Sequence, residues 1–366
     1  MKLFLLNEKL ERIKPISVYE SLTWNTFYRE EGNFTLIVPI SLFPYLLPEE
    51  NRDIFLENTA DANIGIVESV EKTTNENNQK ALTVKGRLAI GLLDRRVSIE
   101  GKNYEDKSPT EVVKDFLEAN FTAPSDTLRK ISLIEYTFEN QPTLPNVDYE
   151  LERGTDGLEL LKSLSKISDF GFYMGLNPNG TKLSLNMYTG TDRSLSQNTV
   201  KPFVIQQRRN TVAQIDYFRN IEPHKTWAEV DKENDKRTTY SNPSDSTLSG
   251  LRRKEVYLDL SSISQTITKA DGTQVVIQDK YYENMIKNEA KSKMETLITT
   301  EYLDSELNEQ TSKKFKKEVY LGDRITIKDD ESGFDQDTYI TGATEVWSNK
   351  GYEVSLQIGQ NTLEEV

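Results

Sequence analysis

The sequence predicts an α+β fold that is mainly β, and three observations lead to this class. Runs in which apolar and polar residues alternate, such as Phe34–Val38, recur in the first and last thirds of the chain. The middle third carries helix-start signals, foremost a capping box at 108–111. The chain has 366 residues, including 17 Tyr, 14 Phe and 3 Trp, which supply enough apolar surface for two or three folded domains.

The first hundred residues predict consecutive short strands, which indicate a sandwich or a small barrel. Polar turns separate the strands, and the polar stretch 73–80 joins the last two as a hairpin. We therefore expect an N-terminal β-barrel-like domain over residues 1–100. The expected strands are Leu3–Leu6, Arg12–Ile16, Leu22–Tyr28, Phe34–Val38, Ile54–Glu57, Ile64–Lys72 and Ala81–Gly86.

Residues 101–200 predict an α+β insertion domain. The first helix begins with the capping box at 108–111, which has proline at the first helical position, and Asn120 is expected to end it. The second helix begins at Thr155 or Asp156 and carries apolar residues at a spacing of three. Two strands follow, 170–174 and 182–188, joined by the turn 177–180.

Residues 201–366 predict a C-terminal β-barrel-like domain with a helical insertion at about 281–311. The insertion rests on apolar residues at helical spacing from Ile286 to Leu307, the longest such stretch in the chain. A Ser- and Asn-rich stretch, 241–249, is expected to be a loop. The expected strands are Ala213–Arg219, Lys225–Val230, a hairpin of Thr266–Lys269 and Gln274–Gln278, Val319–Leu321, Arg324–Lys328, Thr338–Ile340, Thr344–Ser348 and Tyr352–Ile358.

The charge balance argues against a nucleic-acid-binding protein. Lys and Arg number 45 against 59 Asp and Glu, so the formal net charge is −14 at pH 7. Affinity for DNA comes largely from basic side chains that neutralise phosphates, so an acidic chain repels DNA outside a local basic patch. The densest basic stretch, 313–317, precedes a strand-like segment and is interpreted as a solvated edge or helix end rather than a binding patch.

Two residue types that carry much of enzyme chemistry are scarce. The chain has no cysteine, which excludes disulfides, thiolate metal sites and cysteine nucleophiles. His224 is its single histidine, lies in a polar turn and is interpreted as a surface residue. The apolar part of the N-terminus is too short for a signal peptide, and the longest apolar stretch elsewhere, Ala89–Leu93, is far too short to span a bilayer. No stable membrane insertion is expected.

Three motif-like patterns are interpreted as structural. Gly175–Lys182 resembles a phosphate-binding loop, but it lies between two expected strands instead of opening a helix. Asp169–Gly171 resembles the metal-binding triplet of kinases without the other kinase motifs, and its glycine is expected to end a helix. The acids at 329–337 lack the spacing of a calcium loop, so a solvated loop is favoured over weak calcium binding. We assign no catalytic, cofactor-binding or metal-ligating residue and no cofactor.

Several short blocks occur in an order and spacing that resemble one known family. The blocks are 19–28, 31–39, 64–68, 82–87, 92–97, 321–327, 340–346 and 351–356. They resemble the tail hub proteins of long-tailed phages that infect Gram-positive bacteria. These proteins are often called tail-associated lysin proteins, include Gp37-like prophage tail proteins and are related to the hub of contractile tails. The region Asp231–Ile277 has no counterpart in this resemblance.

The resemblance implies a multi-domain tail-hub architecture with two β-barrel-like domains per chain. Three chains would form a ring of six barrels that caps the tail tube, with DNA passing through on ejection. The implied partners are two further copies of the chain, the distal tail protein, the tape measure protein, receptor-binding proteins and the host cell wall. The implied location is the distal end of the virion tail, after synthesis in the host cytoplasm. Many members carry a peptidoglycan hydrolase after the hub region, and none is expected within these 366 residues.

The acidic composition fits a ring of this kind. Three chains carry a formal charge of −42, three times −14, and an acidic channel wall would let DNA slide without sticking. Two other functions stay open. One is a module that binds host cell-wall carbohydrate through aromatic side chains, and the other is a peptidoglycan hydrolase that uses a pair of carboxylates. The leading expectation is a structural protein without enzymatic activity.

Overall fold

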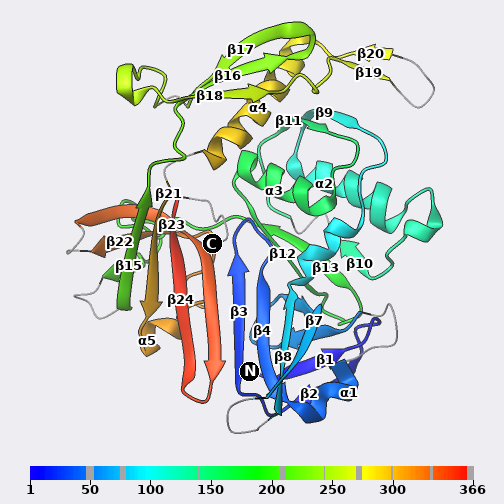
Figure 1. Ribbon diagram of the computed structural model, residues 1–366, viewed down its shortest axis with the longest axis vertical. Coiled ribbons are helices and arrows are strands. Elements are labelled where there is room, and N and C mark those ends of the chain that lie inside the picture. The colour runs from blue at the N-terminus through cyan, green and yellow to red at the C-terminus, as the bar shows by residue number, and fades with distance from the viewer. Residues whose placement is uncertain are drawn as a thin grey trace.

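The largest element of the computed structural model is a ten-stranded sheet that joins the two ends of the chain (Figure 1). The structure describes residues 1–46, 53–74, 80–137, 141–206, 212–242, 244–268, 274–297, 300–329 and 333–360. In the order in which they pair, the main strands are β15 (Val212–Asn220), β21 (Thr300–Leu307), β24 (Gly351–Gln360), β23 (Phe334–Ser348), β3 (Ser21–Phe27), β4 (Asn33–Pro39), β8 (Lys80–Arg87) and β7 (Ser69–Thr74). In addition, β22 (Arg324–Asp329) pairs with β23 and with β14 (Val204–Gln206).

The two ends of the chain meet where β3 pairs with β23. These strands run antiparallel, with Phe27 opposite Gly342. The alternation that predicts β3 and β4 has its expected effect, because every second side chain is buried and those between are half-buried. Trp24 and Phe34 stack inside this core with 5.5 Å between their ring centroids.

A four-stranded sheet packs against the N-terminal part of the large sheet. Its strands, in order, are β2 (Arg12–Ile16), β1 (Leu3–Leu6), β5 (Phe55–Asn58) and β6 (Ile64–Ile66). Leu5 and Leu56 of this sheet share a core with Trp24 and Leu36 of the large one, and the short helix α1 (Phe43–Leu46) lies beside it. None of the sheets in the described residues closes into a barrel, so the N-terminal region is a sandwich.

The middle of the chain builds a second core from helices and short strands. Its elements are a 3₁₀-helix (Ala89–Arg95), α2 (Pro109–Leu117), α3 (Gly157–Ser168), the sheet β10 (Ile134–Tyr136), β13 (Leu183–Tyr188) and β12 (Gly171–Leu176), and the pair β9 (Lys102–Lys107) and β11 (Val147–Leu151). The predicted capping box is present, because the Ser108 and Glu111 side chains each accept a hydrogen bond from the other's backbone N–H. Asp156 caps α3 in the same region through two backbone N–H groups.

A small outer module lies above the middle region in Figure 1. Its sheet has the order β17 (Lys236–Tyr240), β16 (Trp227–Lys232) and β18 (Glu255–Asp259), followed by a hairpin of β19 (Thr266–Thr268) and β20 (Gln274–Val276). The helix α4 (Asp279–Thr296) packs against β16 and β17 and also against β11 and α3, while α5 (Glu309–Ser312) packs on β21 and β24. Within the described ranges, no helix combines the length and the apolar character needed to cross a membrane.

The strand expected over residues 64–72 is two strands in different sheets, β6 and β7. The backbone N–H of Val67 bonds to the Ile54 carbonyl in the small sheet at 2.8 Å. The next N–H, of Glu68, bonds to the Lys85 carbonyl in the large sheet at 3.0 Å. The chain therefore crosses from one layer of the sandwich to the other at this point, and alternation within a single segment does not reveal such a change of partner.

The helical insertion expected at about 281–311 is wrong over residues 300–307. The helix α4 ends at Thr296, and residues 300–307 form β21, which pairs with β15 on one side and with β24 on the other; helix returns only in the short α5. Leu307 is buried, as expected, but it belongs to the strand rather than to the helix. The strand conformation of this segment is determined by pairing with two distant strands. The spacing of apolar residues within the segment gives no sign of that pairing.

Several smaller predictions also need correction. Asn120 does not end the first helix, because a π-helical turn continues to Thr122 and the Asn120 amide donates to the Phe116 carbonyl at 3.0 Å. Val319–Leu321 is not a strand, although Val319 makes one isolated bridge with Phe315. The division of the chain into domains at residues 100 and 200 stays a prediction.

Two further corrections concern a strand and a helix end. The expected strands 338–340 and 344–348 are one long strand, β23, with a bulge next to Gly342. At the end of α3 the residue with a left-handed backbone is Asp169, at a φ of +51°, so the aspartate and not Gly171 ends the helix.

Candidate functional site

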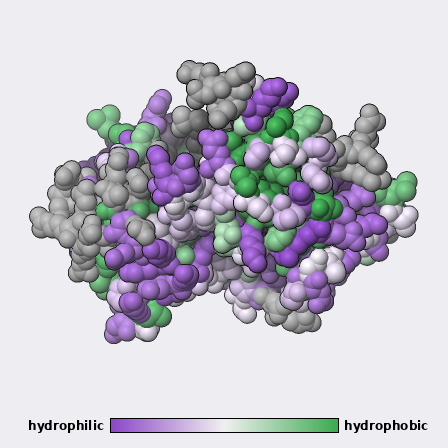
Figure 2. Space-filling view, turned by 90° about the horizontal axis from the view of Figure 1, so that it is seen from below, coloured by the Kyte–Doolittle hydropathy of each residue, from purple (hydrophilic) through white to green (hydrophobic). Residues whose placement is uncertain are grey.

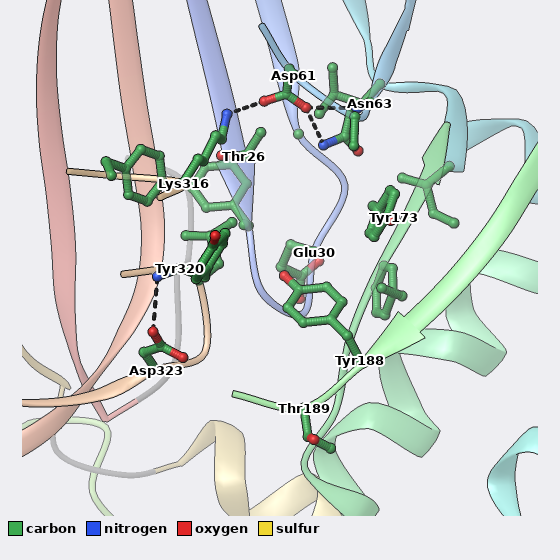
Figure 3. A pocket seen from close by; sticks show the side chains of 18 of the residues that line it. Thr26, Glu30, Asp61, Asn63, Tyr173, Tyr188, Thr189, Lys316, Tyr320 and Asp323 are labelled. Atoms are coloured by element: carbon green, nitrogen blue, oxygen red, sulfur yellow. Dashed lines mark hydrogen bonds and ion pairs between the residues drawn. The ribbon is translucent and has the colours of Figure 1, made fainter. Parts of the chain in front are cut away.

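A cavity of about 580 Å³ lies where three parts of the chain meet (Figure 3). The end of β3 and the loop between β5 and β6 supply one side, and β12 and β13 supply another. The segment 315–323, which leads into β22, closes the third side. Aromatic rings and several charged groups line it, which makes this cavity the best candidate for a functional site in the described part of the chain.

Lys316 ties the segment 315–323 to the N-terminal half of the chain. It follows α5 in a left-handed backbone conformation, with a φ of +60°, which is unfavourable for a lysine. Its ammonium group contacts the carboxylates of Asp61 and Glu345, whose side chains are each 1% exposed. Burial lowers the pKa of Lys316, but the two carboxylates outweigh burial and raise it. The lysine is therefore charged at neutral pH.

The two carboxylates around Lys316 are held by other donors as well. Asp61 accepts hydrogen bonds from the backbone N–H of Asn63 at 2.7 Å and from the Asn63 side-chain amide at 2.8 Å. Glu345 accepts one from the hydroxyl of Tyr352 at 2.7 Å. Burial raises the pKa of Glu345, and Lys316 opposes that shift. A single ammonium group is thus the cationic partner of two buried carboxylates.

Asp323 ties the same segment to the stretch that follows β13. It accepts hydrogen bonds from the backbone N–H of Thr191 at 2.8 Å, from the Arg193 guanidinium at 2.8 Å and from the backbone N–H of Tyr320 at 3.0 Å. Asp323 is only 2% exposed, so these bonds replace its contacts with water. Together, Lys316 and Asp323 fasten one short segment to two other parts of the chain.

Tyrosine rings fill the joint between β3 and the β12–β13 hairpin. The ring centroids of Tyr28 and Tyr188 lie 5.5 Å apart with their planes at 70°, and those of Tyr173 and Tyr188 lie 5.9 Å apart at 61°. Burial raises the pKa of Tyr28 to about 12 and that of Tyr188 well above its usual value. These two hydroxyls are therefore neutral at physiological pH, and the rings pack against one another at this joint.

A second joint holds the outer module to the middle region. Asn284 of α4 donates to the Asp148 carboxylate, and Asn288 donates to the Asp148 carbonyl, both at 2.8 Å. Beside them, Oε2 of Glu150 on β11 is buried and has no hydrogen-bond partner among the described residues. Burial, followed by the negative charge of nearby glutamates, raises the pKa of Glu150 from 4.5 to about 7.

We expect Glu150 to make the folded protein less stable as the pH rises from 4.5 to about 7. Below this window the carboxyl is protonated in both the folded and the unfolded chain. Above it, the folded chain holds an ionised carboxylate in poorly solvated surroundings. E150Q removes that cost, so it should raise the free energy of unfolding by about 1–2 kcal/mol near pH 8 and change it little near pH 4.5. Urea denaturation at both pH values measures this, and an equal effect at both would contradict it.

Of the acids singled out in the sequence at 329–337, Asp335 and Asp337 have partners outside the group. Asp335 pairs with Lys328 at 2.8 Å, and Asp337 accepts a hydrogen bond from the Thr326 hydroxyl at 2.5 Å. Positions 330–332 lie outside the described residues. Within the described ranges, no group of three His, Asp or Glu side chains is placed to hold a metal ion.

The other motif-like patterns have structural places in the fold. Gly175–Lys182 spans the turn of the β12–β13 hairpin, as expected, with Gly180 at a φ of +67°. Asp169 ends α3 and pairs with Arg29 at 2.5 Å. His224 lies half-buried in the loop between β15 and β16 and is not part of the cavity.

The interpretation of 313–317 as a solvated edge or helix end missed the role of Lys316. The short helix α5 does end just before this stretch, yet Lys316 turns inward toward two carboxylates. Its apolar neighbours Phe315 and Val319 are 3% and 0% exposed, so burial of these side chains draws the segment into the protein. Apolar residues within a basic run are the signal that could have identified the buried lysine.

The whole chain matches one protein family. Residues 2–360 match the family described as siphovirus ReqiPepy6 Gp37-like protein. The chain belongs to this family. The resemblance to Gp37-like tail proteins seen in the sequence blocks is thereby confirmed. No curated protein is detectably similar to this Gp37-like chain in sequence.

Solved structures of tail proteins, two of them from prophages, have the same fold. The tail protein from Neisseria meningitidis MC58 has a TM-score of 0.58 at 14% identity, with 98% of this chain and 96% of that chain covered. The 43 kDa tail protein of prophage MuSo2 from Shewanella oneidensis has 0.56 at 9%, with 98% of each chain covered. Prophage tail protein gp18 from Listeria monocytogenes EGD-e has 0.53 at 10%, with 99% and 96% covered. At these identities the similarity is one of fold.

Proposed function

We propose that this Gp37-like protein is a structural component of the phage tail tip. In this role three copies form a hub that caps the tail tube, joins it to the adsorption apparatus and lets DNA pass on ejection. The observation that carries the proposal is the family match over residues 2–360, together with a tail-protein fold that spans nearly the whole chain. Its neighbours at the distal end of the tail are the distal tail protein, the tape measure protein and receptor-binding proteins, which bring it to the host cell wall.

The cavity chemistry supports a structural role over a catalytic one. Lys316 and Arg193, the two basic side chains that line it, are both paired with buried carboxylates. These pairs connect the N-terminal sandwich, the stretch that follows β13 and the segment before β22. A hub that transmits force along the tail needs such rigid connections between its parts, and buried charge pairs supply them.

The ends of the large sheet are suited to self-association. Within the described residues, β15 is the last strand at one end and β7 the last at the other. On β15, Tyr217 and Phe218 point to opposite faces of the strand and are 42% and 44% exposed. Pairing the β15 edge of one copy with the β7 edge of the next is a head-to-tail contact, and such contacts close into rings when the rotation fits.

An apolar surface at the lower end of the molecule supports contact with another tail protein. Figure 2 shows this patch at the end where β2 and α1 lie in Figure 1. Exposed apolar side chains of this region include Ile13, Val18 and Tyr45, at 41%, 67% and 39% exposure. Surfaces of this kind commonly mark protein interfaces.

The acidic composition supports the passage of DNA through the hub. Each chain contributes −14, so a ring of three carries −42. A wall of this sign repels the phosphate backbone and keeps DNA from binding during transit. Changing wall-facing Asp and Glu residues to Lys should slow DNA ejection, and unchanged ejection would contradict the electrostatic part of the proposal.

The mass of the purified chain in solution tests the trimer. Light scattering after size-exclusion chromatography is expected to give about 126 kDa, three times the 42.0 kDa of one chain. A species that stays at 42.0 kDa as the concentration is raised would contradict self-assembly into a ring.

A further inference from the structure

Two aromatic rings form a corner on one side of the junction cavity. Tyr173 of β12 and Tyr188 of β13 have ring centroids 5.9 Å apart and planes inclined at 61°. A positive charge is attracted to the face of an aromatic ring within about 6 Å of its centroid. A ligand in the angle between two inclined rings can be this close to both. Figure 3 shows Tyr320 on the other side of the cavity, with the Glu30 side chain between Tyr320 and the two rings.

The groups around this corner give it a negative charge. On one side, Lys316 is shared by the carboxylates of Asp61 and Glu345. On another, Lys162 is shared by two carboxylates, with 2.5 Å to that of Glu30 and a second contact to Glu31. In each cluster two carboxylates face one ammonium group, so each has a net charge of −1 when both acids are ionised. The third pair, Arg193 with Asp323, is neutral.

The pKa values of the two tyrosines are raised in part by this negative charge. Burial raises the pKa of Tyr173, and the negative charge of Asp61 raises it further. For Tyr188, burial acts first, then the neighbouring tyrosines, then Asp61 and Asp323. Both rings are therefore neutral phenols whose faces attract cations, and they lie in a region of negative potential.

We propose that the corner formed by Tyr173 and Tyr188 binds the ammonium group of a small organic cation, such as the quaternary ammonium of choline. The rings supply two faces for the charge, and the carboxylate clusters supply the field that selects a cation over a neutral or anionic molecule. The cavity, at about 580 Å³, is large enough to accept the rest of a small molecule. This site goes beyond the structural role of the hub and does not depend on it.

Choline and its neutral analogue 3,3-dimethylbutan-1-ol, which has the same shape without the charge, provide the test. Titration of the purified full chain, followed by NMR or calorimetry, is expected to give choline a dissociation constant on the order of millimolar. The neutral analogue should bind at least about tenfold more weakly, because it lacks the attraction to the rings and carboxylates. Equal binding of the two, or no choline binding at concentrations on the order of 100 mM, would overturn the proposal.

Substitutions at Tyr173 locate the site. Y173A should weaken choline binding by about fivefold or more, while Y173F keeps the ring and should bind like the unchanged protein. Y257A is the matched control, because Tyr257 is an exposed tyrosine on β18 of the outer module, 58% accessible. Unchanged choline binding by Y173A would contradict the placement of the site at this corner. Light scattering on the same samples reports the trimer separately, so a failure of choline binding is distinguishable from a failure of self-assembly.

Discussion

K316M is expected to destabilise the protein by about 3–5 kcal/mol. The substitution keeps most of the apolar stem of the side chain but removes the ammonium group shared by Asp61 and Glu345. Both carboxylates are almost inaccessible to water, so they are left as unpaired like charges inside the protein. Urea denaturation at neutral pH, followed by circular dichroism, measures the loss.

Two further variants separate the charge effect from a general effect of mutation. K317A changes an exposed neighbour and should shift the free energy of unfolding by less than about 0.5 kcal/mol. In a background that carries D61N and E345Q, K316M should cost much less, because no buried charge is left unpaired. A loss of under about 1 kcal/mol for K316M in the unchanged background would contradict the assigned role of Lys316.

If the chain forms the proposed trimer, a variant with lysine at both Tyr217 and Phe218 is expected to be a monomer of 42.0 kDa instead. Both side chains lie on β15, at the end of the large sheet, and face opposite sides of it. Lysines on an edge strand oppose pairing with another chain, because the charge would have to be buried in the contact. Sedimentation velocity of the variant and the unchanged protein measures the change.

The matched control for this edge is Y257K. Tyr257 is more exposed than either β15 residue, at 58%, but lies on the small sheet of the outer module. This variant should sediment like the unchanged protein, as the proposed trimer. If the double variant on β15 also remains trimeric, the contact between copies lies elsewhere on the molecule.

Local patterns were sufficient for most of the strands and for both helix starts in the middle region. Alternation identified the strand of Phe34 and Val38, and the capping box placed α2, because each signal depends on residues close together in the chain. The prediction was wrong over 300–307, where pairing with β15 and β24 determines the structure. The sequence left a sandwich and a small barrel both open, since whether a sheet closes depends on strand tilt and register rather than on any one strand.

The candidate site could not be predicted from the sequence, although its chemistry is simple. Lys316 meets Asp61 across 255 positions and Glu345 across 29, and no spacing rule links them. The sequence places Tyr173 and Tyr188 on the two strands of a hairpin. It does not show that both rings line a cavity, because the segment 315–323, far along the chain, closes that cavity. The sequence blocks did indicate the family, because several weakly matching blocks in the right order are together more specific than any single residue.

The most direct test of the tail-tip assignment is immunogold electron microscopy of intact phage particles that carry this protein. Antibodies against the purified chain should label one position, the distal end of the tail, and should leave the head and the tail shaft free. That result would place the Gp37-like chain where a hub must lie. Label along the shaft or on the head, or label on host cells and not on particles, would contradict the assignment.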